Sequence, residues 1–411
     1  MPIHTLYLCY FSLREPLVQT QVLPYLRQLI IDGIEISLIT FEPKSRQRWT
    51  EQEFTEEQAR LAREGIHWSY LRYHKWPSLP ATLYDIWAGA RRASRIIKSR
   101  EVKIIHARSH VAATMGAVAK WMSGGSLIFD IRGFMPEEYV DAGVWSAGSY
   151  LYRLTKAMER RLFSAADAFV VLTEQARNIL FPGCSDVDPS GRPVAVIPCC
   201  VDMDRLRAVE ACSKEELRKE MNLTGRRVIT YVGALGGWYL TREMAEFLAV
   251  AHQQDKSTFS IILTQSEPEI IAAHLGRLGV AEENYSIRSV LPEEVPRYLK
   301  AADIALSLIK PCYSKLSSSP TKIAEYLASG LPIICNSGIG DVDKVIENDR
   351  VGVIIHEFNR EAYLWALYEV ENLRRNENIA DRCRASADSR FDLEKVGGIR
   401  YRQLYRQLLE S

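Results

Sequence analysis

The segment SSSPTKIAEYLASG, residues 317–330, combines a cation, a carboxylate and small hydroxyl side chains at the start of a predicted helix. Pro320 suits the first helical turn, and a serine before it is expected as the N-cap. Lys322 then lies in the first turn, where a cation is unfavourable to the helix dipole, and a phosphate bound at the free N–H groups would compensate. Glu325 lies on nearly the same face and can accept two hydroxyls of a ribose. The alternative is a solvated Lys–Glu pair on a surface helix.

Three glycines follow the apolar run 228–232, which is a predicted strand. Gly233, Gly236 and Gly237 come before a predicted helix, where backbone without side chains can approach a phosphate or a sugar closely. Trp238 can stack on a base or a sugar, or it can pack against the protein. The alternative for the glycines is an ordinary tight turn. Neither GxGxxG nor GxxxxGK[ST] occurs, which disfavours a nicotinamide dehydrogenase or a P-loop enzyme.

Short apolar runs alternate with amphipathic stretches along the chain, which is typical of βα units with parallel strands. Strands are predicted at residues 5–10, 34–40, 66–70, 103–107, 127–131 and 168–172, and again at 228–232, 259–263, 285–288, 304–308, 332–336 and 351–355. Helices are predicted at residues 22–31, 83–98, 111–122, 242–252, 292–301, 321–328 and 393–410. In parallel sheets of this kind ligands bind beyond the carboxyl ends of the strands, so loops after strands are expected to carry the chemistry.

A shift in composition near residues 181–198, rich in Pro, Gly, Asp and Ser, predicts a domain boundary. We therefore expect an α/β protein with two Rossmann-like domains facing across a cleft. The first is residues 1–198, on the acceptor side, and the second is residues 199–390, which binds the nucleotide. Residues 391–411 are expected to form a C-terminal helix that packs back toward the first domain.

Composition excludes several classes of protein. The chain has 411 residues, 52 basic against 51 acidic, with a net charge of +1, which gives no reason to expect a nucleic-acid partner. The apolar fraction of 47% excludes wholesale disorder. The eight cysteines form no CxxC pair and no zinc spacing, so we expect reduced cysteines in a cytoplasmic protein and no metal. No stretch approaches the roughly 20 apolar residues of a membrane span, and no signal peptide is expected.

The second half resembles the C-terminal half of family 4 retaining glycosyltransferases, which have the GT-B fold. That family has two glutamates separated by seven residues, then a small-residue helix, Gly-x-Pro-[VI] and a glycine loop. Glu325, Gly330 and Pro332 match the second part of this element. The position of the first glutamate is occupied by Ser317, and the lysine-containing variant SPTK-x-x-EY takes the place of that glutamate. IPCCVDMDRL resembles the interdomain "IPNGVD" signature, and SAADAFVVLTE and QVLPYLRQLIIDGIEISLITFE resemble earlier elements, so the resemblance spans nearly the whole chain.

The sequence departs from the family at two places. In the family an arginine and a lysine usually hold the donor diphosphate, whereas the corresponding segment here is ALGGWYLTRE, in which Arg242 is the nearby cation. Lys322 is therefore expected to neutralise more of the negative charge of the diphosphate. A usual histidine-glycine pair is replaced by Arg132 and Gly133. Arg132 is expected to contact the donor phosphate or an anionic acceptor, since a guanidinium fork suits phosphate oxygens; a structural pair with Glu137 or Glu138 is the alternative.

The resemblance assigns roles to residues of this sequence. The expected catalytic residues are Lys322, Arg132 and Arg242. The expected substrate-binding residues are Gly233, Gly236, Gly237, Trp238, Ser319, Thr321, Glu325, Gly340 and, for a phosphate on the acceptor, Arg108.

The resemblance implies a transferase that moves a sugar from a nucleotide-sugar to a glycan or lipid-linked acceptor with retention of configuration, without metal or cofactor, in the assembly of bacterial surface polysaccharide. Two alternatives stay open. One is a sugar-nucleotide epimerase of the same fold, and the other is a non-catalytic partner subunit with a decayed site.

Basic side chains are concentrated in two predicted helical stretches, residues 91–108 and 150–163. The second stretch also contains aromatic and leucine side chains. Basic amphipathic helices bind anionic membranes, which would suit a lipid-linked acceptor. The sequence therefore predicts peripheral attachment to the inner face of a membrane, with two solvated helix faces as the alternative.

Overall fold

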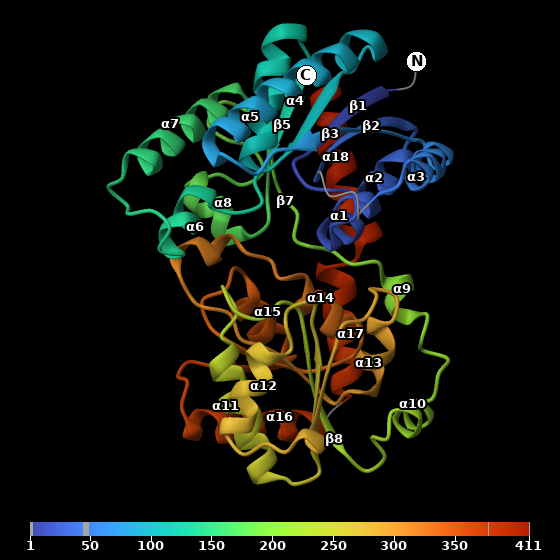
Figure 1. The fold of residues 1–411 in the computed structure, drawn as a ribbon, viewed down its shortest axis with the longest axis vertical. Coiled ribbons are helices and arrows are strands. Elements are labelled where there is room, and N and C mark those ends of the chain that lie inside the picture. The colour runs from blue at the N-terminus through green and yellow to red at the C-terminus, as the bar shows by residue number, and fades with distance from the viewer. Residues whose placement is uncertain (1–2, 44–48, 377, 411) are drawn as a thin grey trace. The chain divides into compact units, whose positions relative to one another are not determined.

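The structure is a computed structural model, and it describes residues 3–43, 49–376 and 378–410. The chain folds into two compact units. Unit 1 contains the described residues of Met1–Pro198 and Leu393–Ser411, and unit 2 is Cys199–Asp392. Each unit is a parallel sheet with helices on its faces, which confirms the predicted α/β class with two Rossmann-like domains (Figure 1).

The sheet of unit 1 has the strand order β3-β2-β1-β4-β5-β6-β7. Its strands are β1 (Ile3–Cys9), β2 (Ile34–Pro43), β3 (Ile66–Tyr73), β4 (Ile104–Arg108), β5 (Ser126–Asp130), β6 (Ala168–Val171) and β7 (Val194–Val196). Its helices are α1 (Pro16–Gln21), α2 (Leu23–Ile31), α3 (Glu51–Arg63), α4 (Ser78–Arg100), α5 (Ser109–Ser123), α6 (Met135–Asp141), α7 (Tyr150–Ala165), α8 (Glu174–Leu180) and α18 (Ile399–Glu410).

The sheet of unit 2 has the strand order β10-β9-β8-β11-β12-β13. Its strands are β8 (Arg227–Val232), β9 (Thr258–Leu263), β10 (Tyr285–Arg288), β11 (Ile304–Ser307), β12 (Ile333–Asn336) and β13 (Gly352–Ile355). Its helices are α9 (Met203–Arg207), α10 (Lys214–Glu220), α11 (Thr241–Gln254), α12 (Glu269–Arg277), α13 (Val295–Ala301), α14 (Thr321–Ala328), α15 (Val342–Asp349), α16 (Arg360–Asn376) and α17 (Ile379–Arg390).

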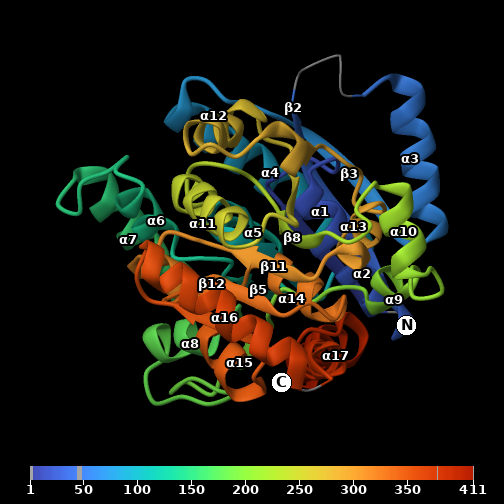
Figure 2. The ribbon, with the colours of Figure 1, turned by 90° about the horizontal axis from the view of Figure 1, so that it is seen from below.

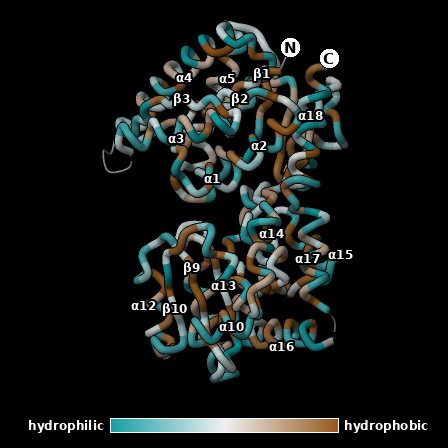
Figure 3. The backbone as a smooth tube through the Cα atoms, turned by 90° about the vertical axis from the view of Figure 1, so that its right-hand side faces the viewer, coloured by the Kyte–Doolittle hydropathy of each residue, from teal (hydrophilic) through white to brown (hydrophobic). Residues whose placement is uncertain are grey.

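The strands form because they are short apolar runs that can be buried on both faces. The β-branched and leucine side chains of β8 and β9 are almost entirely buried, and β9 appears as a hydrophobic stretch in Figure 3. Helices α11 and α16 lie beside one another on one face of this sheet (Figures 1 and 2). Helices α14 and α17 pack together as well. Among the described helices, none has the length and apolar character that crossing a bilayer requires.

The strand order reverses between β1 and β4 in unit 1 and between β8 and β11 in unit 2. At such a switch point the two following loops diverge to opposite faces of the sheet and leave a crevice at the carboxyl ends of the strands. Arg108 ends β4, and Gly233 directly follows β8. Both switch points therefore carry residues that the sequence had marked for function.

All twelve predicted strands are present, with ends within a few residues of their predicted positions, and three local predictions were wrong. Strand β7 lies inside the segment that we expected to be only a linker, because three residues are too few to show a pattern. The final helix is preceded by a π-helical turn, Leu393–Gly398, where Gly397 and Gly398 interrupt the α-helical pattern. Pro320, without a side-chain acceptor, is the N-cap of α14, so the expected serine cap is absent.

Gly352 begins β13 and pairs with Ile333 of β12. A Cβ atom at Gly352 would lie 2.1 Å from the carbonyl oxygen of Ile333, so the two strands would have to separate. We expect Gly352→Ala to lower the free energy of unfolding of unit 2 by about 2–3 kcal/mol. In helix α12, by contrast, a Cβ at Gly276 meets nothing within 4 Å, and Gly276→Ala should stabilise by up to about 1 kcal/mol. Urea denaturation of both variants checks this; equal effects would contradict it.

Candidate active site

The candidate site of unit 2 lies at its switch point, where the loop after β8 meets the loop after β11. The backbone N–H of Lys310 donates to the carbonyl of Trp238 over 2.8 Å, and Leu240 N–H donates to Leu308 over 3.2 Å. Tyr239 forms an antiparallel bridge with Ile309. These main-chain bonds join the two loops, so the glycine segment after β8 and the entry to α14 are held as one structure.

Lys322, on the first turn of α14, points its ammonium group into this crevice. The side chain is 7% exposed, and among the described residues its Nζ atom has no hydrogen-bond partner. It lies instead over two aromatic rings, 4.1 Å from the ring centre of Tyr231 and 4.2 Å from that of Tyr239. Gly233 has a φ of +140°, and a Cβ there would come within 2.7 Å of Nζ. The absent side chain of Gly233 is therefore what makes room for the ammonium group.

Burial lowers the pKa of Lys322 from its ordinary value to about 7, and the nearby Glu325 offsets this only in part. The two tyrosine rings attract a cation through their π faces, but this is worth only about 2 kcal/mol even when the cation is desolvated. A buried ammonium without a hydrogen-bond acceptor is unfavourable. An anion bound beside Gly233 would supply that acceptor and raise the pKa again.

Tyr326, one turn beyond Lys322, holds α14 to both strands of the switch point. Its hydroxyl accepts from Val232 N–H of β8 over 2.7 Å and donates to the carbonyl of Leu306 of β11 over 3.3 Å. The two strands pair directly only at Ile229–Ile304 and Thr230–Ala305. The tyrosine hydroxyl thus forms hydrogen bonds with backbone groups that the two diverging strands do not pair with each other.

A second buried lysine lies beside Trp238, and sequence analysis did not single it out. Lys315, in the 3₁₀ turn Tyr313–Ser317, is 7% exposed, and its Nζ lies 4.0 Å from the ring centre of Trp238. Its carbonyl accepts from Gly340 N–H over 2.9 Å. The structure therefore brings Trp238 and Gly340 to one buried cation.

Glu325 is paired with Arg205, a residue 120 positions earlier in the chain. Nη2 of Arg205 donates to Oε1 of Glu325 over 2.5 Å, and Nη1 donates to the carbonyl of Pro292. The simple surface pair of Lys322 with Glu325, our alternative from the sequence, is absent, because Lys322 is buried and Glu325 pairs elsewhere. Ser319 accepts from Cys199 N–H over 3.1 Å instead of capping α14.

The other predicted residues of unit 2 lie at the rim. Gly236 and Gly237 both have positive φ, and a Cβ at either would meet nothing within 4 Å. Thr321 is half-buried as the first residue of α14. Arg242 is 72% exposed and pairs with Glu246 one turn along α11, so the structure does not bring it to Lys322 through any contact. Its expected role toward a diphosphate stays a prediction.

The predicted arginines of unit 1 surround a buried aspartate at the end of β5. Arg132 Nη1 lies 3.4 Å from Oδ1 of Asp130, and Arg108 Nη1 lies 3.8 Å from Oδ2. Asp130 is fully buried, and His106 and the hydroxyl of Tyr401 from α18 also contact it. Burial alone would raise the pKa of Asp130, but Arg132, His106 and Arg108 outweigh it and hold this pKa well below its usual range.

This arrangement places the two arginines together and gives Arg132 a partner that the sequence did not suggest. Glu137, one expected partner, is instead paired with Lys156 over 3.0 Å. Two guanidinium groups therefore lie beside one buried carboxylate at the end of β5. Asp130 was missed because an aspartate inside the apolar run LIFDI gives no pattern of its own. Among the described residues, no group of three or more His, Cys, Asp and Glu side chains is arranged to hold a metal ion.

The lowered pKa of Lys322 makes stability depend on pH. Between about pH 7 and the ordinary lysine pKa, the unfolded chain holds a proton that the folded chain does not, so folding becomes more favourable as pH rises. Lys322→Met removes this dependence. We expect its stability relative to the natural protein to fall by about 2 kcal/mol between pH 7 and pH 9. Thermal melts across this range check it, with the exposed Lys344→Met as a control that should show no such trend.

Part of the chain is similar in sequence to known proteins. Residues 18–205 match the family model for Glycosyltransferase Family 4. Spore coat protein SA of Bacillus subtilis (strain 168) is 26% identical to this chain over 194 residues, which are 45% of this chain and 50% of that protein. The chain thus matches about half the length of this relative.

Solved structures match over the full length. A glycosyltransferase from Rickettsia africae ESF-5 has a TM-score of 0.73 at 15% identity, covering 100% of this chain and 99% of that one. Alr3699/HepE of Anabaena, in complex with UDP and glucose, has a TM-score of 0.68 at 15% identity and covers 100% of both chains. The chain therefore has the GT-B fold of these glycosyltransferase structures, and its residues 18–205 are similar to Glycosyltransferase Family 4.

Proposed function

We propose that this protein is a retaining glycosyltransferase that moves a sugar from a nucleotide-sugar to a glycan or lipid-linked acceptor. The observation that carries the proposal is the buried ammonium of Lys322, which has no hydrogen-bond partner among the described residues and lies against Gly233 at the switch point of unit 2. The family match and the similarity to a structure that contains UDP and glucose support a nucleotide-sugar as donor.

Such a transfer requires that the negative charge on the leaving group be stabilised. When the bond between the sugar and the diphosphate breaks, negative charge develops on the phosphate oxygens. Lys322 meets that charge from a site whose water is already excluded, so the interaction is stronger than at an exposed lysine. A bound diphosphate also raises the pKa of Lys322, so donor binding takes up a proton near pH 7 and above.

The arginine pair of unit 1 suits an acceptor that carries phosphate. Arg108 and Arg132 both lie beside Asp130. Guanidinium groups bind phosphate oxygens through paired N–H donors. We therefore assign these two arginines to a phosphate on the acceptor, as in a lipid-linked sugar, with the polysaccharide of a bacterial surface as the product.

A contiguous surface of unit 1 supports attachment to a membrane. Helices α4, α5 and α7 pack side by side (Figure 1). They carry exposed large apolar side chains, which include Leu83, Trp87, Trp121, Tyr150 and Leu154. The second half of α4 adds the basic side chains Arg91, Arg92, Arg95 and Lys98. Aromatic side chains beside basic ones suit an anionic membrane interface, so we propose a cytoplasmic protein that binds the inner face of a membrane.

Kinetics of two variants test the donor site. Lys322→Ala should lower kcat by roughly 10² to 10³, because the lysine acts on charge that develops in the transition state. Glu325→Gln should mainly raise the KM for the donor, because ribose contacts are equal in ground and transition states. The glutamine still offers an acceptor to Arg205, so the fold should persist, and thermal melts confirm this first.

The control is Lys344→Ala, an exposed lysine of unit 2 whose loss should leave kcat and KM unchanged. Equal loss of kcat in Lys322→Ala and Glu325→Gln would contradict the division of roles. An epimerised nucleotide-sugar without a glycosidic product would favour the epimerase. Absence of any nucleotide-sugar binding in calorimetry, tested with UDP-, GDP- and dTDP-sugars, would favour a non-catalytic partner subunit.

The membrane surface is tested with vesicles. The protein should co-sediment with vesicles that contain anionic lipid more than with neutral ones, and Trp121→Gln should weaken this several-fold because the indole is 86% exposed. Trp365→Gln, which removes an exposed tryptophan from α16 of unit 2, is the matched control and should have no effect. Equal sedimentation with both kinds of vesicle, or with neither, would refute the attachment.

A further inference from the structure

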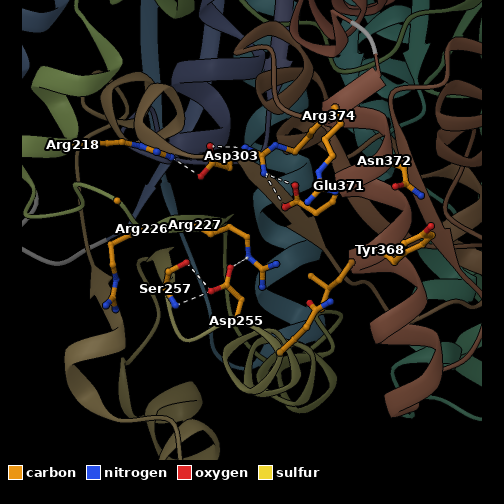
Figure 4. A pocket seen from close by; sticks show the side chains of 14 residues that line it. Arg218, Arg226, Arg227, Asp255, Ser257, Asp303, Tyr368, Glu371, Asn372 and Arg374 are labelled. Carbon is orange, nitrogen blue, oxygen red and sulfur yellow. Dashed lines mark hydrogen bonds and ion pairs between the residues drawn. The ribbon is translucent and has the colours of Figure 1, made fainter.

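A cavity of about 560 Å³ opens in unit 2 at the amino-terminal edge of its sheet. It is bordered by the ends of α10, α11 and α16 and by the starts of β8 and β9 (Figure 4). Five arginines line it: Arg218, Arg226, Arg227, Arg374 and Arg375. We call this the arginine cavity. The candidate active site lies at the opposite, carboxyl edge of the same parallel strands, about 20 Å away by the length of a six-residue strand.

One carboxylate at the edge of the arginine cavity is shared by three cations. Asp303 is 6% exposed at its side chain, and it contacts Lys214 at 3.0 Å, Arg218 at 2.5 Å and Arg374 at 3.0 Å. Burial alone would raise the pKa of Asp303, but Lys214, Arg374 and Arg218 outweigh it and lower this pKa. Burial lowers the pKa of Lys214, and Asp303 offsets this only in part.

The other two acids of the cavity do not remove the excess. Glu371 pairs with Arg374 at 2.8 Å, and Asp255 lies 3.6 Å from Arg227 (Figure 4). Lys214 and the five arginines thus face three carboxylates. Helices α11 and α16 end here, and each C-terminus adds about half a negative charge, which still leaves about two positive charges.

Donor groups remain for a ligand. Arg226 contacts only neutral groups, with Nη2 donating to Asn284 over 2.6 Å and its guanidinium over the ring of Phe259. Arg375 is exposed in the last turn of α16, and no ion pair joins it to another described residue. Leu367 and Tyr368 provide an apolar wall on one side. The excess charge, the spare donors and the volume of this open cavity together suit a small anion with several oxygens.

We propose that the arginine cavity binds a small phosphate-bearing molecule, at a site separate from the nucleotide-sugar site. A phosphate group bound there would neutralise part of the excess positive charge of the arginine cavity. This site is independent of Lys322, so it stands or falls separately from the proposed transferase activity.

Calorimetry with inorganic pyrophosphate tests the proposal. The titration is done on full-length Lys322→Ala, which removes one cation of the candidate active site and leaves Arg108 and Arg132 of unit 1 unchanged. Adding Arg226→Gln and Arg375→Gln together should weaken binding at the arginine cavity about tenfold or more, since each removes a charge-assisted donor, and this loss reports the arginine cavity. Arg360→Gln, at the far end of the same helix α16, is the matched control and should leave the affinity unchanged.

Thermal melts of each variant without ligand confirm that the fold is retained, and pyrophosphate should raise the melting temperature of Lys322→Ala more than that of the triple variant. No pyrophosphate binding to Lys322→Ala would overturn the proposal. So would equal affinity in the triple variant, or the same loss with Arg360→Gln. The double variant Arg226→Gln, Arg375→Gln on the natural background should still bind nucleotide-sugar, so its result separates this site from the donor site.

Discussion

Unit 2 is organised around the burial of one ammonium group without a carboxylate to pair with it. Lys322 enters the crevice because Gly233 has no side chain, and its Nζ lies between the rings of Tyr231 and Tyr239. The lowered pKa of Lys322 is a cost to folding at neutral pH. The diphosphate that we propose as ligand would offset this cost.

Unit 1 reaches a similar state by different means. Its switch point also buries cationic side chains, but here a buried carboxylate, Asp130, contacts the two arginines. A lysine can give up its proton when buried, whereas an arginine stays charged and needs a counter-ion. This difference explains why Lys322 is buried alone while Arg108 and Arg132 share an acid.

The fold was predictable from the sequence because twelve strands are apolar runs separated by amphipathic stretches. Strand β7 was not, since three residues in a Pro- and Gly-rich segment carry no period. The residue type of Lys322 and its place at a helix start pointed to phosphate chemistry. The burial of its side chain was not predictable, because it depends on side chains from β8. The pairing of Glu325 with Arg205 links residues 120 apart, which no local pattern indicates. The sequence therefore indicated which residues are candidates for the site, but it did not predict their interaction partners from other elements.

The hydroxyl of Tyr326 fixes the position of α14 against two strands of the sheet, independently of the loop that precedes this helix. It bonds to Val232 on one strand and to Leu306 on the other, where the two strands have already separated. A slide of α14 along its axis would break both bonds and expose two main-chain groups in a dry interior. The depth of Lys322 is therefore set by the spacing of two sheet strands.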